Sequence, residues 1–308
     1  MHGNVVLAVD ARCVAREADA TNAAVPDSSN CVGHLRTILV TSHSRFLGNR
    51  TRVSPKDFFT PRPPVLSLIV PVYNGVARLP AALDQLREFL RARPYSWELI
   101  FVDDHSDEEV ARALDTFADA APCVSVLHND SNMGKGYSVS RGMRVARGAY
   151  RVFTDADLAY PTTEIDKILD ALRGGADVAV ACRVLPDSRY LMSPTFFSYL
   201  YTRHVMSRLF NALVRWTLIP RVRDTQAGLK GFTAAAAELV FPRVTIPRFG
   251  FDVEALFIAR KFGLSIEQVA VNFRYDEEPT TVRFVKDAAE MARDLGRIRT
   301  NEWRRRYD

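Results

Sequence analysis

From residue 65 onward, short apolar runs alternate with segments in which apolar residues recur every three or four positions. The runs read VLSLIVPVY, WELIFVDD, VSVLHN, YRVFTDAD and DVAVACR. Such runs are typical of buried strands, whereas the segments between them, for example 77–92 and 134–148, have helical periodicity. The alternation predicts an α/β fold with a mostly parallel, Rossmann-like sheet and helices on both of its faces.

Two segments flank this pattern. Residues 1–62 are rich in Ala, Ser, Asn and Thr and end in TPRPP, so we expect a poorly ordered N-terminal extension, with a short strand around 36–41 as one option. The α/β domain is expected over 63–275. Residues 276–308 are expected to form a basic amphipathic helix.

Composition adds limits to this picture. The 308 residues are 47% apolar and 25% charged, which is ordinary for a globular protein, and the net charge is +5. Between Arg189 and Gly231 there are seven Lys or Arg and one Asp or Glu. Such a patch suits a membrane surface, a phosphate-bearing substrate or nucleic acid, or is simply a solvated face. The acidic strand ends described next argue against nucleic acid.

Cysteine spacing and hydropathy favour a reducing compartment and no spanning helix. The four cysteines form no C-x-x-C pair, so neither a disulfide framework nor a zinc site is expected. There is no run of eighteen apolar residues, and the N-terminus lacks the basic-then-apolar order of a secretory signal.

Polar residues end several of the predicted strands. They are Asn74, Asp103, Asp104, Asp155 and Asp157. Ligands of open parallel sheets bind outside the carboxyl ends of the strands, so these residues are expected to share one site.

The pair Asp155 and Asp157 is a candidate metal site. Two carboxylates so close repel one another unless a cation lies between them, and carboxylate oxygens suit Mg²⁺ or Mn²⁺. A single D-x-D is also common in turns without a metal. Asp104 is able either to bind a base or ribose or to cap the next helix.

The stretch NMGKGYSVSRG, at 132–142, is a glycine-rich turn that enters a helix. A helix N-terminus with Lys135 beside it favours anions, although the dinucleotide and P-loop fingerprints are both absent. Together with the aspartates, this turn predicts a site for a nucleotide diphosphate bridged by a metal.

These motifs, VPVYN, VDD-x-S, N-x-G-K-G, DAD-L and the downstream DTQAGLKGF, occur in an order that resembles the inverting family-2 glycosyltransferases of GT-A fold. The resemblance covers about residues 65–300. It is strongest to the dolichyl- or polyprenyl-phosphate glucosyltransferases and the related mannosyltransferases. DTQAGLKGF favours the glucosyl branch.

The resemblance implies roles for individual residues. The donor site would contain Pro71, Tyr73, the backbone of Val102, Asp104, Lys135, Asp155, Ala156, Asp157, Arg183 and Arg283. The metal, Mg²⁺ or Mn²⁺, would be held by Asp155 and Asp157. The pocket for sugar and acceptor would contain Asp224, Gln226, Lys230 and Glu254. The catalytic residues would be Asp157, Arg183 and Asp252.

Three positions depart from the family pattern. Gly75 stands where an acidic nucleotide contact is frequent, and His105 replaces a glycine in the turn after the second strand. Ala159 stands where the mannosyl branch has a glutamine ligand, so water, diphosphate or Gln226 would complete the metal's ligands.

The reaction implied is an inverting displacement at the anomeric carbon of a UDP-sugar, most of all UDP-glucose. A polyprenyl or dolichyl phosphate is already anionic near neutral pH, since a phosphate monoester has a second pKa of about 6. Asp252 is therefore a base, an orienting group or only a helix cap. The alternatives are transfer to a sugar or polysaccharide hydroxyl, and a catalytically silent nucleotide-sugar-binding protein.

The acceptor is inferred from residues 193–220. His204, Arg208, Asn211 and Arg215 form one polar stripe, and aromatic and aliphatic residues cover the rest. Such amphipathic helices lie in a bilayer interface, in a core or in a dimer contact. The C-terminal RIRTNEWRRRYD has the same character. We expect peripheral attachment to the cytoplasmic face of a membrane, and homo-oligomerisation as a further option.

Overall fold

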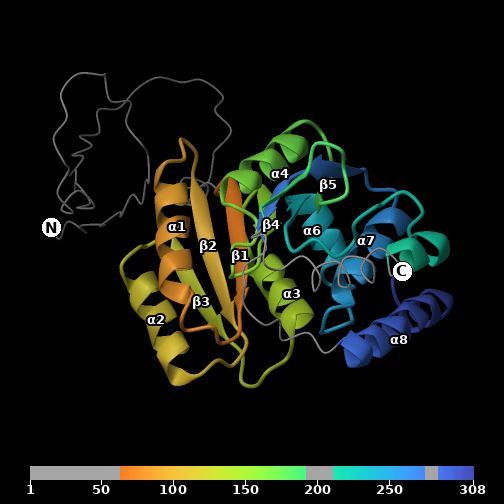
Figure 1. Ribbon diagram of the computed structural model, residues 1–308, viewed down its shortest axis with the longest axis horizontal. Coiled ribbons are helices and arrows are strands. Elements are labelled where there is room, and N and C mark those ends of the chain that lie inside the picture. Colours follow the sequence, from red (N-terminus) through yellow and green to blue (C-terminus); the bar gives the residue numbers. More distant parts are fainter. Residues whose placement is uncertain (1–62, 192–210, 275–283) are drawn as a thin grey trace, which may run out of the picture. The chain divides into compact units, whose positions relative to one another are not determined.

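The computed structural model describes residues 63–191, 211–274 and 284–308 (Figure 1). The expectations for the extension 1–62, for Arg283 and for most of the segment 193–220 lie outside the described residues. In the described residues, the apolar runs form strands and the segments with helical periodicity form helices.

Within the described residues, seven strands form one sheet in the order β3-β2-β1-β4-β7-β5-β8. Six of them run in the same direction, and β7 is antiparallel to both of its neighbours. The predicted mostly parallel sheet is confirmed. Its strands are β1 (Leu66–Val72), β2 (Trp97–Asp103), β3 (Val124–His128), β4 (Tyr150–Phe153), β5 (Val178–Cys182), β7 (Lys230–Thr233) and β8 (Ile266–Ala270).

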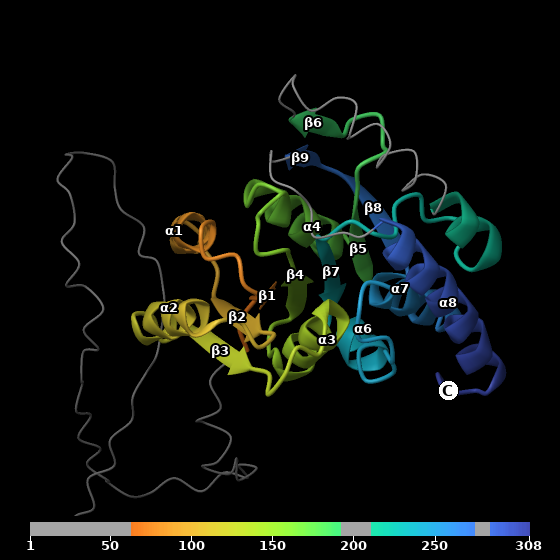
Figure 2. The same cartoon turned by 60° about the horizontal axis from the view of Figure 1, so that its bottom comes forward.

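The strands alternate in sequence with helices, and the helices cover both faces of the sheet. They are α1 (Leu79–Arg91), α2 (Glu108–Asp119), α3 (Lys135–Val145), α4 (Thr163–Arg173), α6 (Ala234–Val240), α7 (Phe251–Lys261) and α8 (Phe284–Trp303). In Figure 2, α4 lies on the opposite face of the sheet from α3 and α6.

Each face of the sheet has its own core because successive strand residues point in opposite directions. In β1, Leu68 and Val70 join the core that includes buried residues of α1, α2 and α4. Ile69 joins the other core, with residues of α3, α6 and α7. The side chains of β1 are therefore buried on both faces of the sheet, which accounts for its largely apolar sequence.

The helix α8 belongs to the second of these cores. Leu295 and Ile298 are buried in it, and so is Tyr307, which follows the helix. None of the helices in the described part of the chain combines the length and the apolar character needed to cross a bilayer. A separate two-stranded parallel sheet is formed by β6 (Arg189–Leu191) and β9 (Asn272–Arg274).

The antiparallel strand β7 brings a late part of the chain to the carboxyl edge of the sheet. Its first residue, Lys230, pairs with Phe153, the last residue of β4, and with Val180 of β5. The preceding residues 224–229 therefore approach the ends of β4 and β5. The motif DTQAGLKGF consequently lies beside the motif DAD-L, about seventy residues earlier in the sequence.

Candidate active site

The loops after β1 and β2 are joined by hydrogen bonds at the carboxyl edge. The Asn74 backbone N–H donates to Ser106 Oγ (2.9 Å), and the Asp107 N–H donates to Asn74 Oδ1 (2.8 Å). Asn74 has a left-handed φ of 54°. The neighbouring Tyr73 is 58% exposed, so its ring is free to meet a ligand.

Pro71 and Val102, which are also expected around a nucleoside, differ in how far they are buried. Pro71 is half-buried in β1 and pairs with Val102 of β2. Val102 is fully buried, and its side chain belongs to the core. Val102 also pairs with Leu127 of β3, so a contact between its backbone and a nucleoside stays a prediction.

Asp104 holds the glycine-rich turn before α3. Its carboxylate accepts hydrogen bonds from Asn129 Nδ2 (2.7 Å), the Met133 N–H (2.8 Å) and the Gly134 N–H (2.8 Å), and the residue is only 4% exposed. The alternative role as the N-cap of α2 is not what the structure shows, because Asp107 occupies that position.

Asp103 holds the turn that contains His105. Its carboxylate accepts a hydrogen bond from the Ser106 N–H (3.0 Å) and pairs with His128 Nδ1 (2.9 Å). His105 is exposed and has a φ of 64°. The turn thus keeps the left-handed conformation that glycine favours, although the residue there is histidine.

Lys135 and Asp155 form an ion pair across the edge. Lys135 is the first residue of α3, Asp155 follows β4 by two residues, and Lys135 Nζ lies 2.5 Å from Asp155 Oδ1. Burial opposes the charge of Lys135, but the carboxylates of Asp155, Asp252 and Asp157 outweigh it and raise the pKa of the lysine. The site therefore holds a fixed positive charge where an anion is expected.

Asp155 and Asp157 are held in a turn. The Leu158 N–H donates to the Asp155 carbonyl (3.1 Å), the Ala159 N–H donates to Asp157 Oδ1 (3.0 Å), and Leu158 has a φ of 48°. Ala156 lies between the aspartates and is half-buried. Burial and the charge of Asp155 raise the pKa of Asp157.

This pair fits a hard divalent cation. Both side chains offer carboxylate oxygens, and Asp157 is exposed where a ligand could reach it. In the described part of the chain, no group of three or more His, Cys, Asp or Glu side chains is placed to hold a metal. Mg²⁺ is usually bound by one or two protein carboxylates, and its other ligands come from substrate phosphate and water.

Gly228 lies directly against Asp155. A Cβ atom at this position would lie 1.9 Å from Asp155 Oδ2, far inside van der Waals contact. Only glycine leaves room for the carboxylate in its present place. Gly228 was not among the predicted site residues, although it lies inside the motif DTQAGLKGF.

Arg183 and Asp224 form a second pair at the end of β5. The Arg183 Nε and Nη2 atoms donate to the two Asp224 carboxylate oxygens at 2.7 Å and 3.0 Å. The Arg183 guanidinium also lies 5.4 Å from the ring centre of Phe273. Burial raises the pKa of Asp224, but the arginine's charge and hydrogen bonds reverse this and lower it.

Lys230 and Asp252 form a third pair, which is buried. Lys230 Nζ lies 2.5 Å from Asp252 Oδ1 and also donates to the Ala227 carbonyl (2.5 Å). Burial lowers the pKa of Lys230 and raises that of Asp252. Since Ala227 precedes Gly228, this pair connects the first turn of α7 to the backbone that touches Asp155.

Two further expected residues are placed differently. Glu254 is fully buried and faces the loop 245–246 and Tyr307, so the structure does not bring it into the group around Asp252. Gln226 is half-buried, with its Nε2 atom 3.6 Å from Met291 Sδ. Arg283 lies outside the described residues.

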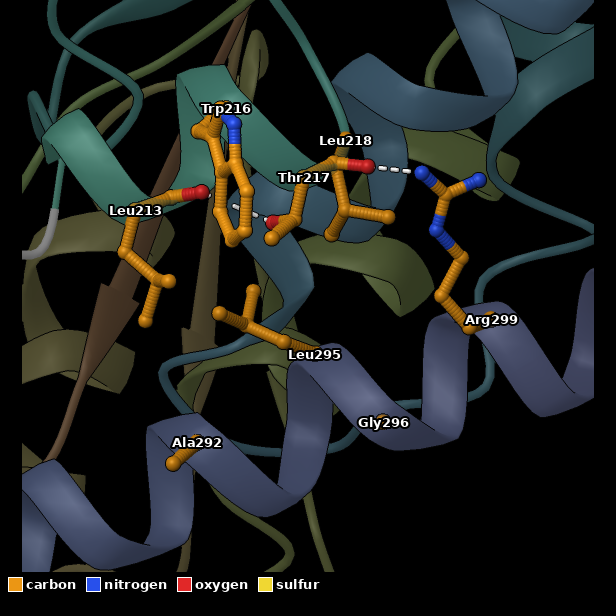
Figure 3. A pocket seen from close by; sticks show the side chains of 8 residues that line it. All are labelled: Leu213, Trp216, Thr217, Leu218, Ala292, Leu295, Gly296 and Arg299. Carbon is orange, nitrogen blue, oxygen red and sulfur yellow. Dashed lines mark hydrogen bonds between the residues drawn. The ribbon is translucent and has the colours of Figure 1, made fainter.

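A mostly apolar groove lies between the helical residues 211–217 and α8 (Figure 3). Trp216 stands over it and is 85% exposed, and Trp303 of α8 is 83% exposed. The groove has a volume of about 420 Å³ and is lined by Leu213, Trp216, Thr217, Leu218, Ala292, Leu295, Gly296 and Arg299.

Solved structures define the class of the fold. Glucosyl-3-phosphoglycerate synthase from Mycobacterium tuberculosis, in complex with Mn²⁺, UDP-glucose and phosphoglyceric acid, matches with a TM-score of 0.54 and 16% identity over 76% of this chain and 78% of that chain. The protein thus has the GT-A fold of glycosyltransferases.

Sequence relatives define the family. The glycosyl transferase family 2 model matches residues 67–213. The dolichyl-phosphate beta-glucosyltransferase of Dictyostelium discoideum is 32% identical over 246 residues, covering 76% of this chain and 73% of that protein. The protein of the same name from Homo sapiens is 30% identical over 254 residues, covering 78% and 77%. The chain belongs to glycosyltransferase family 2.

Proposed function

We propose that this protein transfers glucose, with inversion, from UDP-glucose to a dolichyl or other polyprenyl phosphate. Its named relatives are dolichyl-phosphate beta-glucosyltransferases. The observation that carries the proposal is the contact between Lys135 and Asp155, because a lysine beside the carboxylate pair at the carboxyl edge would suit a metal-bound diphosphate.

Asp155 and Asp157 would hold Mg²⁺ or Mn²⁺. When bound, the ion would neutralise the developing negative charge of the departing nucleotide. Lys135, at the N-terminus of α3, would stabilise the same negative charge of the departing nucleotide. It would exchange its contact with Asp155 for one with the diphosphate. The absence of a side chain at Gly228 would leave room for the Asp155 carboxylate during this exchange.

The acceptor phosphate would supply its own nucleophile. One of its oxygens forms the new bond to the anomeric carbon while the bond from that carbon to the UDP oxygen breaks, and UDP leaves. No proton has to be removed from an already ionised phosphate, so Asp252 would orient rather than deprotonate. Its buried pairing with Lys230 supports this role, since the lysine fixes the position of the carboxylate.

The exposed tryptophans support attachment to a membrane surface. Trp216 and Trp303 are large amphipathic side chains exposed beside several arginines, such as Arg215 and Arg304. Aromatic rings and arginines favour the headgroup region of bilayers. We propose a peripheral contact through this surface, on the side of the membrane where UDP-glucose is available.

One experiment tests the donor and the acceptor of the proposed reaction together. Purified protein is incubated with radiolabelled UDP-glucose, UDP-galactose, UDP-N-acetylglucosamine or GDP-mannose and a short polyprenyl phosphate, with and without Mn²⁺. We expect butanol-extractable label from UDP-glucose, dependent on the metal. The Asp157→Asn variant should retain less than about 1% of the activity, because it removes one charged ligand.

Other outcomes would contradict parts of the proposal. Label in a water-soluble saccharide would indicate a hydroxyl acceptor. Full activity of the Asp157→Asn variant would exclude the metal role of that residue. Absence of turnover with every donor, in a protein that binds UDP and Mn²⁺, would favour a nucleotide-sugar-binding protein.

A further inference from the structure

We infer that Glu254 and Tyr307 are positioning residues for donor binding, acting on Lys135 through the loop 245–248. This inference rests on the proposed function, because it assigns Lys135 to the nucleotide diphosphate. It concerns residues that lie behind the site and do not touch the donor-binding residues themselves.

The Glu254 carboxylate is saturated with hydrogen bonds. Its Oε2 atom accepts from the Thr245 N–H (2.8 Å) and the Ile246 N–H (2.7 Å), and its Oε1 atom accepts from Thr245 Oγ1 (2.7 Å) and the Tyr307 hydroxyl (2.7 Å). A carboxylate has about four lone-pair directions, so all of them are used. Because Glu254 is fully buried, each lost donor leaves negative charge without compensation.

The loop held in this way supports both neighbours of Lys135. The Pro247 carbonyl accepts a hydrogen bond from the Tyr137 N–H (3.0 Å). A Cβ atom on Gly134 would lie 2.6 Å from the Pro247 carbonyl oxygen, and one on Gly136 would lie 2.6 Å from the Ile246 carbonyl oxygen. The first turn of α3 is therefore pressed against the loop, and a shift of the loop would move Lys135.

Tyr307 closes the network from behind. It is fully buried, its hydroxyl also accepts a hydrogen bond from Asn301 Nδ2 (3.3 Å), and its carbonyl accepts one from Arg243 Nε (2.9 Å). Burial and the hydrogen bond to Glu254 raise the pKa of the Tyr307 phenol. The hydrogen bonds to Asn301 and Arg243 fix the ring so that its hydroxyl points at Glu254.

The test uses Tyr307→Phe, which removes the hydroxyl and keeps the ring. Binding of UDP with Mn²⁺ is measured by calorimetry in two backgrounds, wild type and Lys135→Met. We expect Tyr307→Phe to weaken binding about 3- to 10-fold in the wild-type background and less than twofold in the Lys135→Met background. A purely structural role would weaken binding equally in both backgrounds.

Two further variants keep the result interpretable. Tyr95→Phe removes a comparable hydroxyl-to-carboxylate hydrogen bond, from Tyr95 to Asp166 (3.3 Å), and should leave UDP binding unchanged. Thr245→Val removes one donor to Glu254 and should reproduce the effect of Tyr307→Phe, even if the latter does not fold.

The outcomes separate this inference from the proposed function. Folded Tyr307→Phe and Thr245→Val proteins that bind UDP like the wild type would overturn the inference alone. Equal weakening in the two Lys135 backgrounds would also overturn it. A wild-type protein that binds no UDP with Mn²⁺ would remove both the inference and the proposed donor.

Discussion

Lys230 Nζ and Asp252 Oδ1 lie 2.5 Å apart in the interior, where both side chains are at most 6% exposed. Charged groups this deeply buried are tolerated only when they are paired. The pair joins the start of β7 to the first turn of α7, two elements separated by about twenty residues of sequence. Through the Ala227 carbonyl, Lys230 also holds the backbone that precedes Gly228.

We predict that Lys230→Met lowers the free energy of unfolding by about 3–5 kcal/mol, because it leaves Asp252 as a buried group without its partner. The double variant Lys230→Met/Asp252→Leu should recover most of this loss, since it replaces the whole pair by apolar side chains. Urea unfolding of the three proteins measures both effects. If Lys230→Met alone unfolds at the wild-type urea concentration, the pair is not a stability determinant.

Glucosyl transfer by the double variant provides a second readout. The variant should remain at least about 100-fold less active than the wild type, because Asp252 is then missing from the pocket. Recovery of activity together with stability would show that Asp252 has no role in the reaction.

Gly228→Ala is predicted to displace the Asp155 carboxylate, since the new Cβ atom would lie 1.9 Å from Oδ2. The affinity for UDP with Mn²⁺ should fall about 10-fold or more, and the overpacking should cost about 1–3 kcal/mol of stability. Calorimetry and urea unfolding measure these effects. The control is Gly296→Ala in α8, where the added Cβ would meet no atom within 4 Å apart from its chain neighbours and the backbone of its own helix.

That control should gain up to about 1 kcal/mol of stability from helix propensity, with unchanged UDP affinity. Equal UDP affinity in Gly228→Ala and the wild type would mean that the position of Asp155 does not matter to donor binding.

Much of the fold follows from the sequence because the strands of a parallel sheet are buried on both faces. Their largely apolar runs locate β1, β2, β4 and β5, and the polar residues that follow them locate the carboxyl edge. The antiparallel strand β7 was not predicted. It is only four residues long and includes a buried lysine, so it lacks the pattern of a strand.

The site was harder to predict than the fold, because residues close in sequence point toward different parts of the protein. Asp252 and Glu254 lie two apart on α7, about 200° around the helix, and the resemblance to the family assigned both to one pocket. In the structure, Asp252 meets Lys230, whereas Glu254 meets Thr245 and Tyr307. The partner Tyr307 is 53 residues away, and nothing in the local sequence indicates this contact.

His128 is predicted to make stability depend on pH. Hydrogen bonds from its ring to Asp103 and Asp115 raise its pKa above 6.5, against the opposing effect of partial burial. Its contribution is therefore fully present below about pH 6.5 and is lost as the pH rises through the raised pKa of the folded state.

We expect wild type to exceed His128→Gln in unfolding free energy by more at pH 5.5 than at pH 9. The difference should be modest, about 1 kcal/mol or less, because the side chain is 41% exposed. Urea titrations at the two pH values measure it. A difference that is larger at pH 9 would show that the sign is wrong.

Substitution of His105 tests whether the turn after β2 requires only a left-handed backbone conformation or the histidine side chain itself. A non-glycine residue at its φ of 64° costs roughly 1–2 kcal/mol, and the imidazole is exposed. His105→Gly should consequently be more stable than His105→Ala by about 1 kcal/mol, the reverse of the order found inside helices. Both variants should bind UDP with Mn²⁺ as the wild type does, whereas a common loss of Mn²⁺-dependent binding would identify His105 as a metal ligand.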